Sequence, residues 1–205
     1  MACDFLNIPY ESRVLAYDNI NLPEKLAGKK MLPIMEFSNG EVSNESLDIV
    51  AKLDTENNLF LSVSDKEVKI YENICNEIGS FLHPLAMPSW LNTPEFFNES
   101  KKYFREKKEK KRGPFTDLVK RAPELREDLY LFLETFSVPS KFIKGEYLTI
   151  LDIMVASHLY GIYTLLDFCV PKTIHEFLQR VKVSCGFSYH SDFKIDQDFK
   201  HWDAK

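Results

Sequence analysis

Hydrophobic residues recur with a helical period along the C-terminal two thirds of the chain. Between residues 65 and 87 the apolar positions lie three or four residues apart: Val68, Tyr71, Ile74, Cys75, Ile78, Phe81 and Leu82. This spacing predicts an amphipathic helix, which Pro84 and Pro88 should bend or end. Similar patterns predict further helices over 94–111, 124–136, 149–168 and 172–183. Thr149 and Asp152 form a capping-box pattern at the start of the most apolar of these helices.

The first 54 residues mix strand and helix patterns. Short β-branched and aromatic runs predict strands at 11–17, 32–37 and 41–44. Asn39-Gly40 between the last two runs predicts a hairpin with a type I′ turn, because both central residues of that turn need a positive φ. We expect a helix over 46–53, followed by a linker over 54–58. The pattern as a whole predicts an α/β unit followed by an all-α unit.

Composition and charge narrow the classes of function. Of the 205 residues, 44% are hydrophobic and 28% are charged, as in ordinary globular proteins. The net charge of −5 gives no general attraction to nucleic acid or to an anionic membrane. The most apolar stretch, 153–166, has 14 residues, whereas a membrane span takes roughly 20. No export signal is visible before Arg13, so we expect a cytoplasmic protein. We also expect a monomer with no nucleic acid or membrane partner.

Two dipeptides that flank the predicted hairpin are candidate ligand-binding residues. A cis Leu32–Pro33 bond would turn the backbone of Leu32 outward, where it can pair with an extended peptide. Ser46 opens the next helix, whose free N–H groups and dipole favour an anion, and Glu45 beside it can accept from an amine. The implied ligand is a small peptide-like molecule. Two plainer interpretations stay open: Ser46 as an ordinary N-cap, and a trans Leu32–Pro33 bond.

Several segments together resemble the two-domain glutaredoxin 2 family of the glutathione transferase-like superfamily. They are NIPYESRVLAYDN (7–19), GKKMLP (28–33), ESLDIV (45–50), PEFFNESKKYFREKKE (94–109) and LTILDIMVASHL (148–159). The resemblance implies an incomplete, N-terminally truncated thioredoxin-like, glutathione-binding domain over 1–56. It further implies a helical glutathione transferase-like C-terminal domain over 64–190, which leaves a polar tail at 191–205.

The same resemblance assigns roles to the four candidate residues. Leu32 and Pro33 match the residue before the cis-proline and the proline itself. Glu45 and Ser46 match the residues that hold the γ-glutamyl end of glutathione. The implied activity is glutathione-dependent thiol–disulfide exchange, with glutathione as co-substrate and disulfide or glutathionylated proteins as substrates.

The position of the cysteines departs from that family. Its members carry a strand and then Cys-Pro-Tyr-Cys ahead of the segment with which Met1 aligns, so no catalytic cysteine is expected here. Cys3 is expected to be a small core residue, and Cys185 is the candidate exposed thiol. The four cysteines show no zinc spacing, so no metal site is expected.

Three explanations of that departure stay open. The gene start lies too far downstream, the chain is a fragment, or it is a degenerate member that binds glutathione without catalysis. We expect one of the first two. Conjugation chemistry would use a residue from the same missing segment, so exchange and conjugation are not separated.

Residues 100–112 suggest a competing function. They hold eight basic and two acidic residues, which leaves about −11 on the rest of the chain. Such a run can bind RNA or an acidic partner. On a helix, however, Tyr103 and Phe104 would face inward and the charges outward, as on an ordinary solvated surface.

Overall fold

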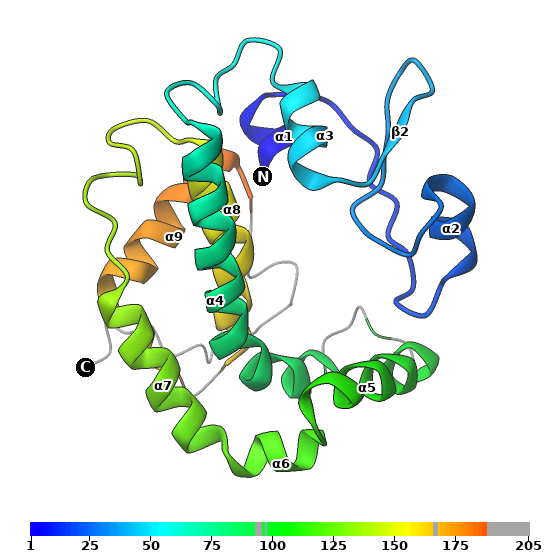
Figure 1. The fold of residues 1–205 in the computed structure, drawn as a ribbon, viewed down its shortest axis with the longest axis vertical. Coiled ribbons are helices and arrows are strands. Elements are labelled where there is room, and N and C mark those ends of the chain that lie inside the picture. The colour runs from blue at the N-terminus through cyan, green and yellow to red at the C-terminus, as the bar shows by residue number, and fades with distance from the viewer. Residues whose placement is uncertain (93–95, 97, 166–167, 188–205) are drawn as a thin grey trace.

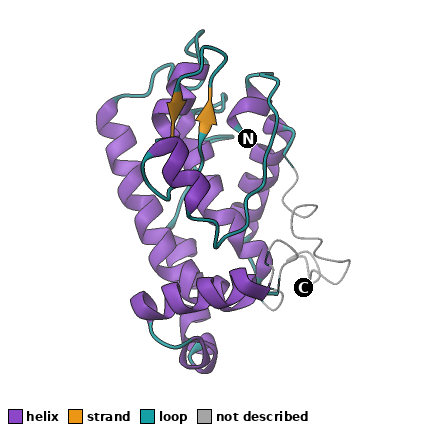
Figure 2. Cartoon of the chain, turned by 90° about the vertical axis from the view of Figure 1, so that its right-hand side faces the viewer, coloured by secondary structure: helices purple, strands orange, loops and turns teal. Residues whose placement is uncertain are grey.

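A computed structural model describes residues 1–92, 96, 98–165 and 168–187 of the chain. In order, its elements are α1 (Ala2–Phe5), α2 (Asn21–Ala27), β1 (Met35–Glu36), β2 (Val42–Ser43), α3 (Ser46–Leu53), α4 (Asp65–Trp90), α5 (Asn98–Arg112), α6 (Phe115–Lys120), α7 (Ala122–Thr135), α8 (Ile150–Leu159), the 3₁₀ helix η1 (Tyr160–Thr164) and α9 (Lys172–Cys185). Figure 1 shows the N-terminal part, in blue to cyan, beside a larger helical part. Figure 2 shows two short strands at one end of a body built of helices. The predicted α/β unit followed by an all-α unit is confirmed.

Parts of the sequence-based prediction lie outside the described residues. These are the polar tail at 191–205, the end of the helical unit predicted over 64–190, and parts of the helices predicted over 94–111 and 149–168. Within the described residues, no helix combines the length and the apolar character needed to cross a bilayer.

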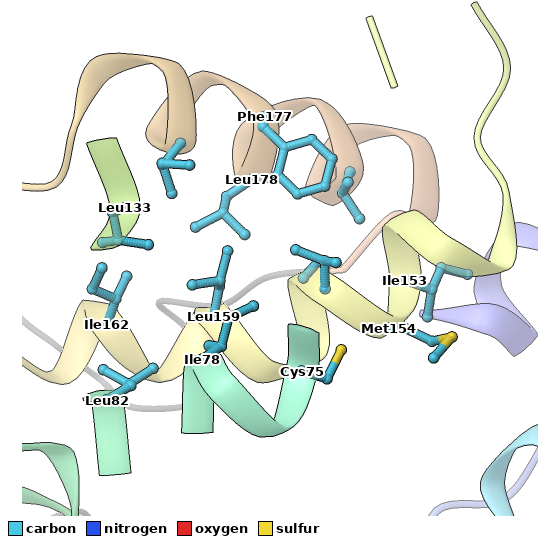
Figure 3. Packing of buried hydrophobic residues seen from close by; sticks show 14 of the residues in the cluster. Cys75, Ile78, Leu82, Leu133, Ile153, Met154, Leu159, Ile162, Phe177 and Leu178 are labelled. Atoms are coloured by element: carbon cyan, nitrogen blue, oxygen red, sulfur yellow. The ribbon is translucent and has the colours of Figure 1, made fainter. Parts of the chain in front are cut away.

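α8 lies at the centre of the helical part. Its sequence is mostly apolar, and Ile150–Ala156 and Leu159 are buried, whereas Ser157 and His158 are exposed. α8 packs against α4 and α9. Figure 3 shows Ile78 of α4, Leu159 of α8 and Leu178 of α9 in one apolar cluster. α1 and α3 also pack against this cluster, which joins the N-terminal part to the helical core.

The carboxylate of Asp152 fixes the start of α8. Its Oδ2 accepts hydrogen bonds from the backbone N–H of Thr149 at 2.8 Å and from the Thr149 hydroxyl at 2.9 Å. Its Oδ1 accepts from the N–H of Ile143 at 2.8 Å. Asp152 is fully buried, and this burial raises its pKa although the hydrogen bonds lower it. The predicted capping box is confirmed, and the same carboxylate also holds the preceding loop.

α4 and α6 differ from the helices that the sequence predicted. α4 runs through both Pro84 and Pro88 to Trp90, and it changes direction near its C-terminal end (Figure 1). α6 has six residues, too few to show a helical period, and was not predicted.

The strand predicted over 11–17 is wrong, because the segment is not a strand in the structure. The sheet in the described residues has two antiparallel strands, with Met35 opposite Ser43 and Glu36 opposite Val42. A strand needs a neighbour for its backbone N–H and C=O groups, and no described strand lies beside 11–17. The segment instead carries Tyr17 into an aromatic cluster with Phe96 and Phe104.

The β1–β2 hairpin is confirmed, but its predicted turn type is wrong. The N–H of Phe37 donates to the carbonyl of Glu41 at 2.8 Å, and the N–H of Gly40 donates to the carbonyl of Phe37 at 2.8 Å. Gly40 has φ +81°, whereas Asn39 is not among the residues with positive φ. This is a three-residue loop that ends in a left-handed glycine, not a two-residue type I′ loop.

The connection predicted as a linker over 54–58 is ordered by Asp54. The Asp54 carboxylate accepts from the backbone N–H groups of Asn58 and Leu59, each at 2.7 Å. Leu59 is fully buried, and its carbonyl accepts from the N–H of Ile150 at 2.9 Å. The C-terminal end of α3 is therefore joined, through this loop, to the first residue of α8.

A second apolar cluster joins α4, α5 and α6: Met87, Leu91, Phe104, Phe115 and Leu118. His83 of α4 lies close by, with its Nδ1 3.2 Å from Nη2 of Arg112 and its ring 5.9 Å from that of Trp90. Burial, followed by the positive charges of Arg112 and Lys108, lowers the pKa of His83 to about 4. His83 is therefore neutral at neutral pH.

Asp152→Ala should destabilise the protein by about 2 kcal/mol or more, because two buried backbone N–H groups lose their acceptor and the cap of α8 is lost. Urea unfolding measures the change. Glu146→Ala, in the exposed part of the same loop, is the matched control and should change stability little. Equal stability of the two variants would contradict this role of Asp152.

The depressed pKa of His83 predicts a loss of stability on acidification. As the pH falls from about 7 to about 5, the unfolded chain takes up a proton at this histidine that the folded chain does not, so the free energy of unfolding falls. Urea unfolding at a series of pH values should show a shallower dependence for His83→Gln. The Ser80→Ala variant, at an exposed position of the same helix, removes no titratable group and should keep the slope of the parent, and an unchanged slope in His83→Gln would refute the assignment.

Candidate functional site

The hairpin and the start of α3 bring the four sequence-predicted residues to one place. The pairing of Met35 with Ser43 sets the antiparallel register. Leu32 and Pro33 precede β1 by three and two residues, and Glu45 and Ser46 follow β2 by two and three residues. Leu32, Pro33, Glu45 and Ser46 therefore lie at the same end of the hairpin.

The backbone of Leu32 is open at this site. The Leu32–Pro33 peptide bond is cis, so the trans alternative is wrong. The Leu32 side chain is 55% exposed. Neither its N–H nor its C=O forms a hydrogen bond with another described residue. This exposed donor and acceptor pair could bind the backbone of a short extended ligand.

Ser46 does not cap α3. The N-cap is Glu45, with an extended backbone and no side-chain capping bond, and Ser46 is the first helical residue. The Ser46 hydroxyl has no hydrogen-bond partner among the described residues. The plainer interpretation of Ser46 as the N-cap is therefore wrong. The start of α3 offers a free hydroxyl and uncapped backbone N–H groups, an arrangement that favours an anion.

The carboxylate of Glu45 is held by a lysine that sequence reasoning missed. Lys29 Nζ lies 2.8 Å from Glu45 Oε1, and both side chains are about half exposed. The two residues are 16 positions apart, so no local pattern pointed to the pair. An exposed ion pair contributes little to stability, but it shows that Glu45 is positioned to accept from an ammonium group.

Three of the cysteines, Cys3, Cys75 and Cys185, lack the lowered pKa of an activated thiol. Burial raises the pKa of Cys75 to about 12 and that of Cys185 to about 11. Cys185 was expected in a loop as the exposed thiol, and this is wrong: it ends α9 and its side chain is 1% exposed. It lies four residues after the buried Val181, on the inner side of the helix. Cys3, expected in the core, is only partly buried, and burial raises its pKa as well.

The hollows that the structure shows lie elsewhere. One of about 380 Å³ lies between α9 and the loop before α8, with Lys141, Thr173 and Arg180 among its lining residues. None of the four candidate residues lines it. The candidate site is thus an exposed edge at the end of a hairpin, not an enclosed pocket.

Two family models match the chain. "Glutaredoxin 2, C terminal domain" matches residues 70–188, and "Glutathione S-transferase, N-terminal domain" matches residues 1–56. Glutaredoxin 2 of Escherichia coli strain K12 is 30% identical over 116 residues, which are 55% of this chain and 54% of that protein. Glutaredoxin 2 of Escherichia coli O157:H7 matches to the same extent. The chain thus spans about half the length of the curated relatives it matches.

A solved structure supports the same assignment at the level of the fold. Glutaredoxin 2 from Salmonella typhimurium, in complex with glutathione, superposes with a TM-score of 0.78 over 95% of this chain and 91% of that one, at 22% identity. The fold is that of a glutathione transferase-like protein. Because the glutaredoxin 2 model covers more than half of the sequence, the chain belongs to the glutaredoxin 2 family.

Proposed function

We propose that this chain binds glutathione through Leu32, Pro33, Glu45 and Ser46. The observation that carries the proposal is that the open backbone of Leu32 and the uncapped start of α3 lie at the same end of the hairpin. Glutathione has an extended backbone with an ammonium and a carboxylate at its γ-glutamyl end, so it matches this set of groups. Membership of the glutaredoxin 2 family and the glutathione complex of the Salmonella relative support the choice of ligand.

Each residue has a distinct part in this proposal. The N–H and C=O of Leu32 pair with the peptide backbone of glutathione, and Pro33 sets the direction of the chain there. The Ser46 hydroxyl and the first N–H groups of α3 donate to the γ-glutamyl carboxylate. Glu45 accepts from the γ-glutamyl ammonium, which takes the place of, or shares the carboxylate with, Lys29.

For the chemistry, we propose glutathione-dependent thiol–disulfide exchange on disulfide or glutathionylated proteins, with glutathione as co-substrate. In this reaction a thiolate attacks a disulfide sulfur, forms a mixed disulfide and releases the other sulfur as a thiol. In this proposal the expected domain 1–56 binds glutathione, and the expected domain 64–190 supports the first domain. A monomer in the cytoplasm, where thiols stay reduced, is part of the same proposal.

A second candidate function is glutathione binding without exchange. It is favoured by one observation, the raised pKa values of Cys3, Cys75 and Cys185. A reactive cysteine needs a lowered pKa, as at a helix N-terminus or in a Cys-x-x-Cys pair. Cys75 and Cys185 lie in the middle and at the C-terminal end of their helices, and the pKa of Cys3, which lies in the first turn of α1, is nevertheless raised by burial.

Ser46→Ala should weaken glutathione binding by about 1–3 kcal/mol, because a charge-assisted hydrogen bond to the carboxylate is lost. The free energy of unfolding should change by less than about 0.5 kcal/mol, since Ser46 is not the cap. Titration calorimetry and urea unfolding measure the two effects. Ser38→Ala, an exposed serine in the hairpin turn, is the control. Unchanged affinity in Ser46→Ala would remove this residue from the site.

Residues 1–205 alone should show no glutathione-dependent reduction of a mixed disulfide, because burial raises the pKa of Cys3, Cys75 and Cys185. A version preceded by the strand and Cys-Pro-Tyr-Cys segment of the family should be active. The comparison is a coupled disulfide-reduction assay on both proteins. Activity of the short form that Cys3→Ser abolishes would contradict the prediction and make Cys3 the nucleophile.

A further inference from the structure

α5 presents a patch of exposed basic side chains. The patch, called here the α5 basic patch, consists of Lys102, Arg105, Lys107, Lys110 and Lys111. None of these five forms an ion pair or a hydrogen bond with another described residue. Of the two acidic residues within 100–112, Glu109 is occupied, because its Oε1 accepts from the N–H of Phe115 at 2.8 Å. Glu99 and Glu106 are the two exposed acidic residues of α5 beside the five cations of the patch.

The first turns of α5 are anchored to the N-terminal part. Phe104 is 1% exposed, and its ring centroid lies 4.9 Å from that of Tyr17. The hydroxyl of Ser100 donates to the carboxylate of Asp18. The ammonium of Lys30 lies 4.1 Å from the ring centroid of Tyr103. These contacts fix the orientation of α5 relative to the N-terminal part.

The positive charges crowd one another at the C-terminal end of α5. Burial, followed by the neighbouring charges of Lys107, Arg112 and Lys111, lowers the pKa of Lys108. The same cluster contributes to the low pKa of His83 on α4. The described chain thus holds several cations together without a matching set of anions, an arrangement that an external anion would stabilise.

The patch also adjoins the candidate glutathione site. Lys30, which rests on Tyr103 of α5, is two residues before Leu32 in the sequence. A partner lying along α5 would therefore reach the exposed edge where Leu32 is open. From Lys102 to Lys111 the helix extends about 14 Å, the length of about four residues of extended chain.

We propose that the α5 basic patch is a docking surface for an acidic segment of a protein partner. Acidic side chains on an extended segment complement its charge and its length. A nucleic acid fits less well, because Tyr103 and Phe104 are taken up by packing and offer no free ring for a base to stack on. In addition, the remaining charge of about −11 repels a long polyanion. That the partner is a disulfide substrate rests on the proposed function; the docking itself does not.

The test is the binding of a fluorescent oligoglutamate peptide to the full chain, without glutathione. Lys107→Gln, Lys110→Gln and Lys111→Gln combined should weaken binding about tenfold at low ionic strength, with three favourable charge interactions lost. Added salt should weaken binding to the parent protein. The matched control combines Lys25→Gln, Lys66→Gln and Lys141→Gln, three exposed lysines without an ion pair in the described residues, and should bind as the parent does.

A second variant guards against a change in the fold of α5. Lys102→Gln with Arg105→Gln removes charge from the other end of the patch and should weaken binding about fivefold; circular dichroism checks that each variant is folded. Equal affinity of folded patch variants and parent, or an equal loss in the control triple, would overturn the proposal. Tighter binding of a single-stranded DNA of the same charge than of the peptide would also overturn it, in favour of nucleic acid. Failure of Ser46→Ala to affect glutathione binding would leave this result standing, so the two proposals fail separately.

Discussion

The buried carboxylate of Asp152 is the interaction on which the order of the helical part depends. A buried carboxylate is costly unless it is hydrogen-bonded, and here three donors from Thr149 and Ile143 surround it. It therefore fixes both the start of α8 and the loop that leads into it. Because α4 and α9 pack directly on α8, the position of these helices follows from the same group.

The N-terminal part is held in place by its contacts with the helical part more than by its own sheet. Two strands of two residues each are too few to be stable alone. The part is held instead by α1 and α3, which pack on the main apolar cluster, and by Tyr17, which packs on α5. The polar groups left open, at Leu32, at Ser46 and on α5, lie on the portion that the core does not cover. The proposed binding functions thus lie where the fold leaves polar groups without an internal partner.

Local patterns predicted the longer helices but not the short helices α1, α2 and α6, and non-local pairing decided the strands. The period of apolar residues and the Thr149–Asp152 spacing are contained within a few residues, so both could be read from the sequence. The strand expected over 11–17 depended on a neighbour elsewhere in the chain, and the described residues hold none. At the candidate site, the residue types and the family resemblance indicated the four positions. The Lys29–Glu45 pair spans 16 residues of sequence and only the folded hairpin shows it.

The two ends of α3 make different contacts, and this affects how the helix can move. Its first residue is Ser46, and the residue after its last, Asp54, holds the loop that is hydrogen-bonded to α8. Eight residues make a helix about 12 Å long, short enough to tilt as one rigid piece. Local opening of the loop at Leu59 would release one end of this piece and shift the other end away from Leu32. We therefore expect hydrogen exchange at the Leu59 amide and ligand binding at Leu32 to change together.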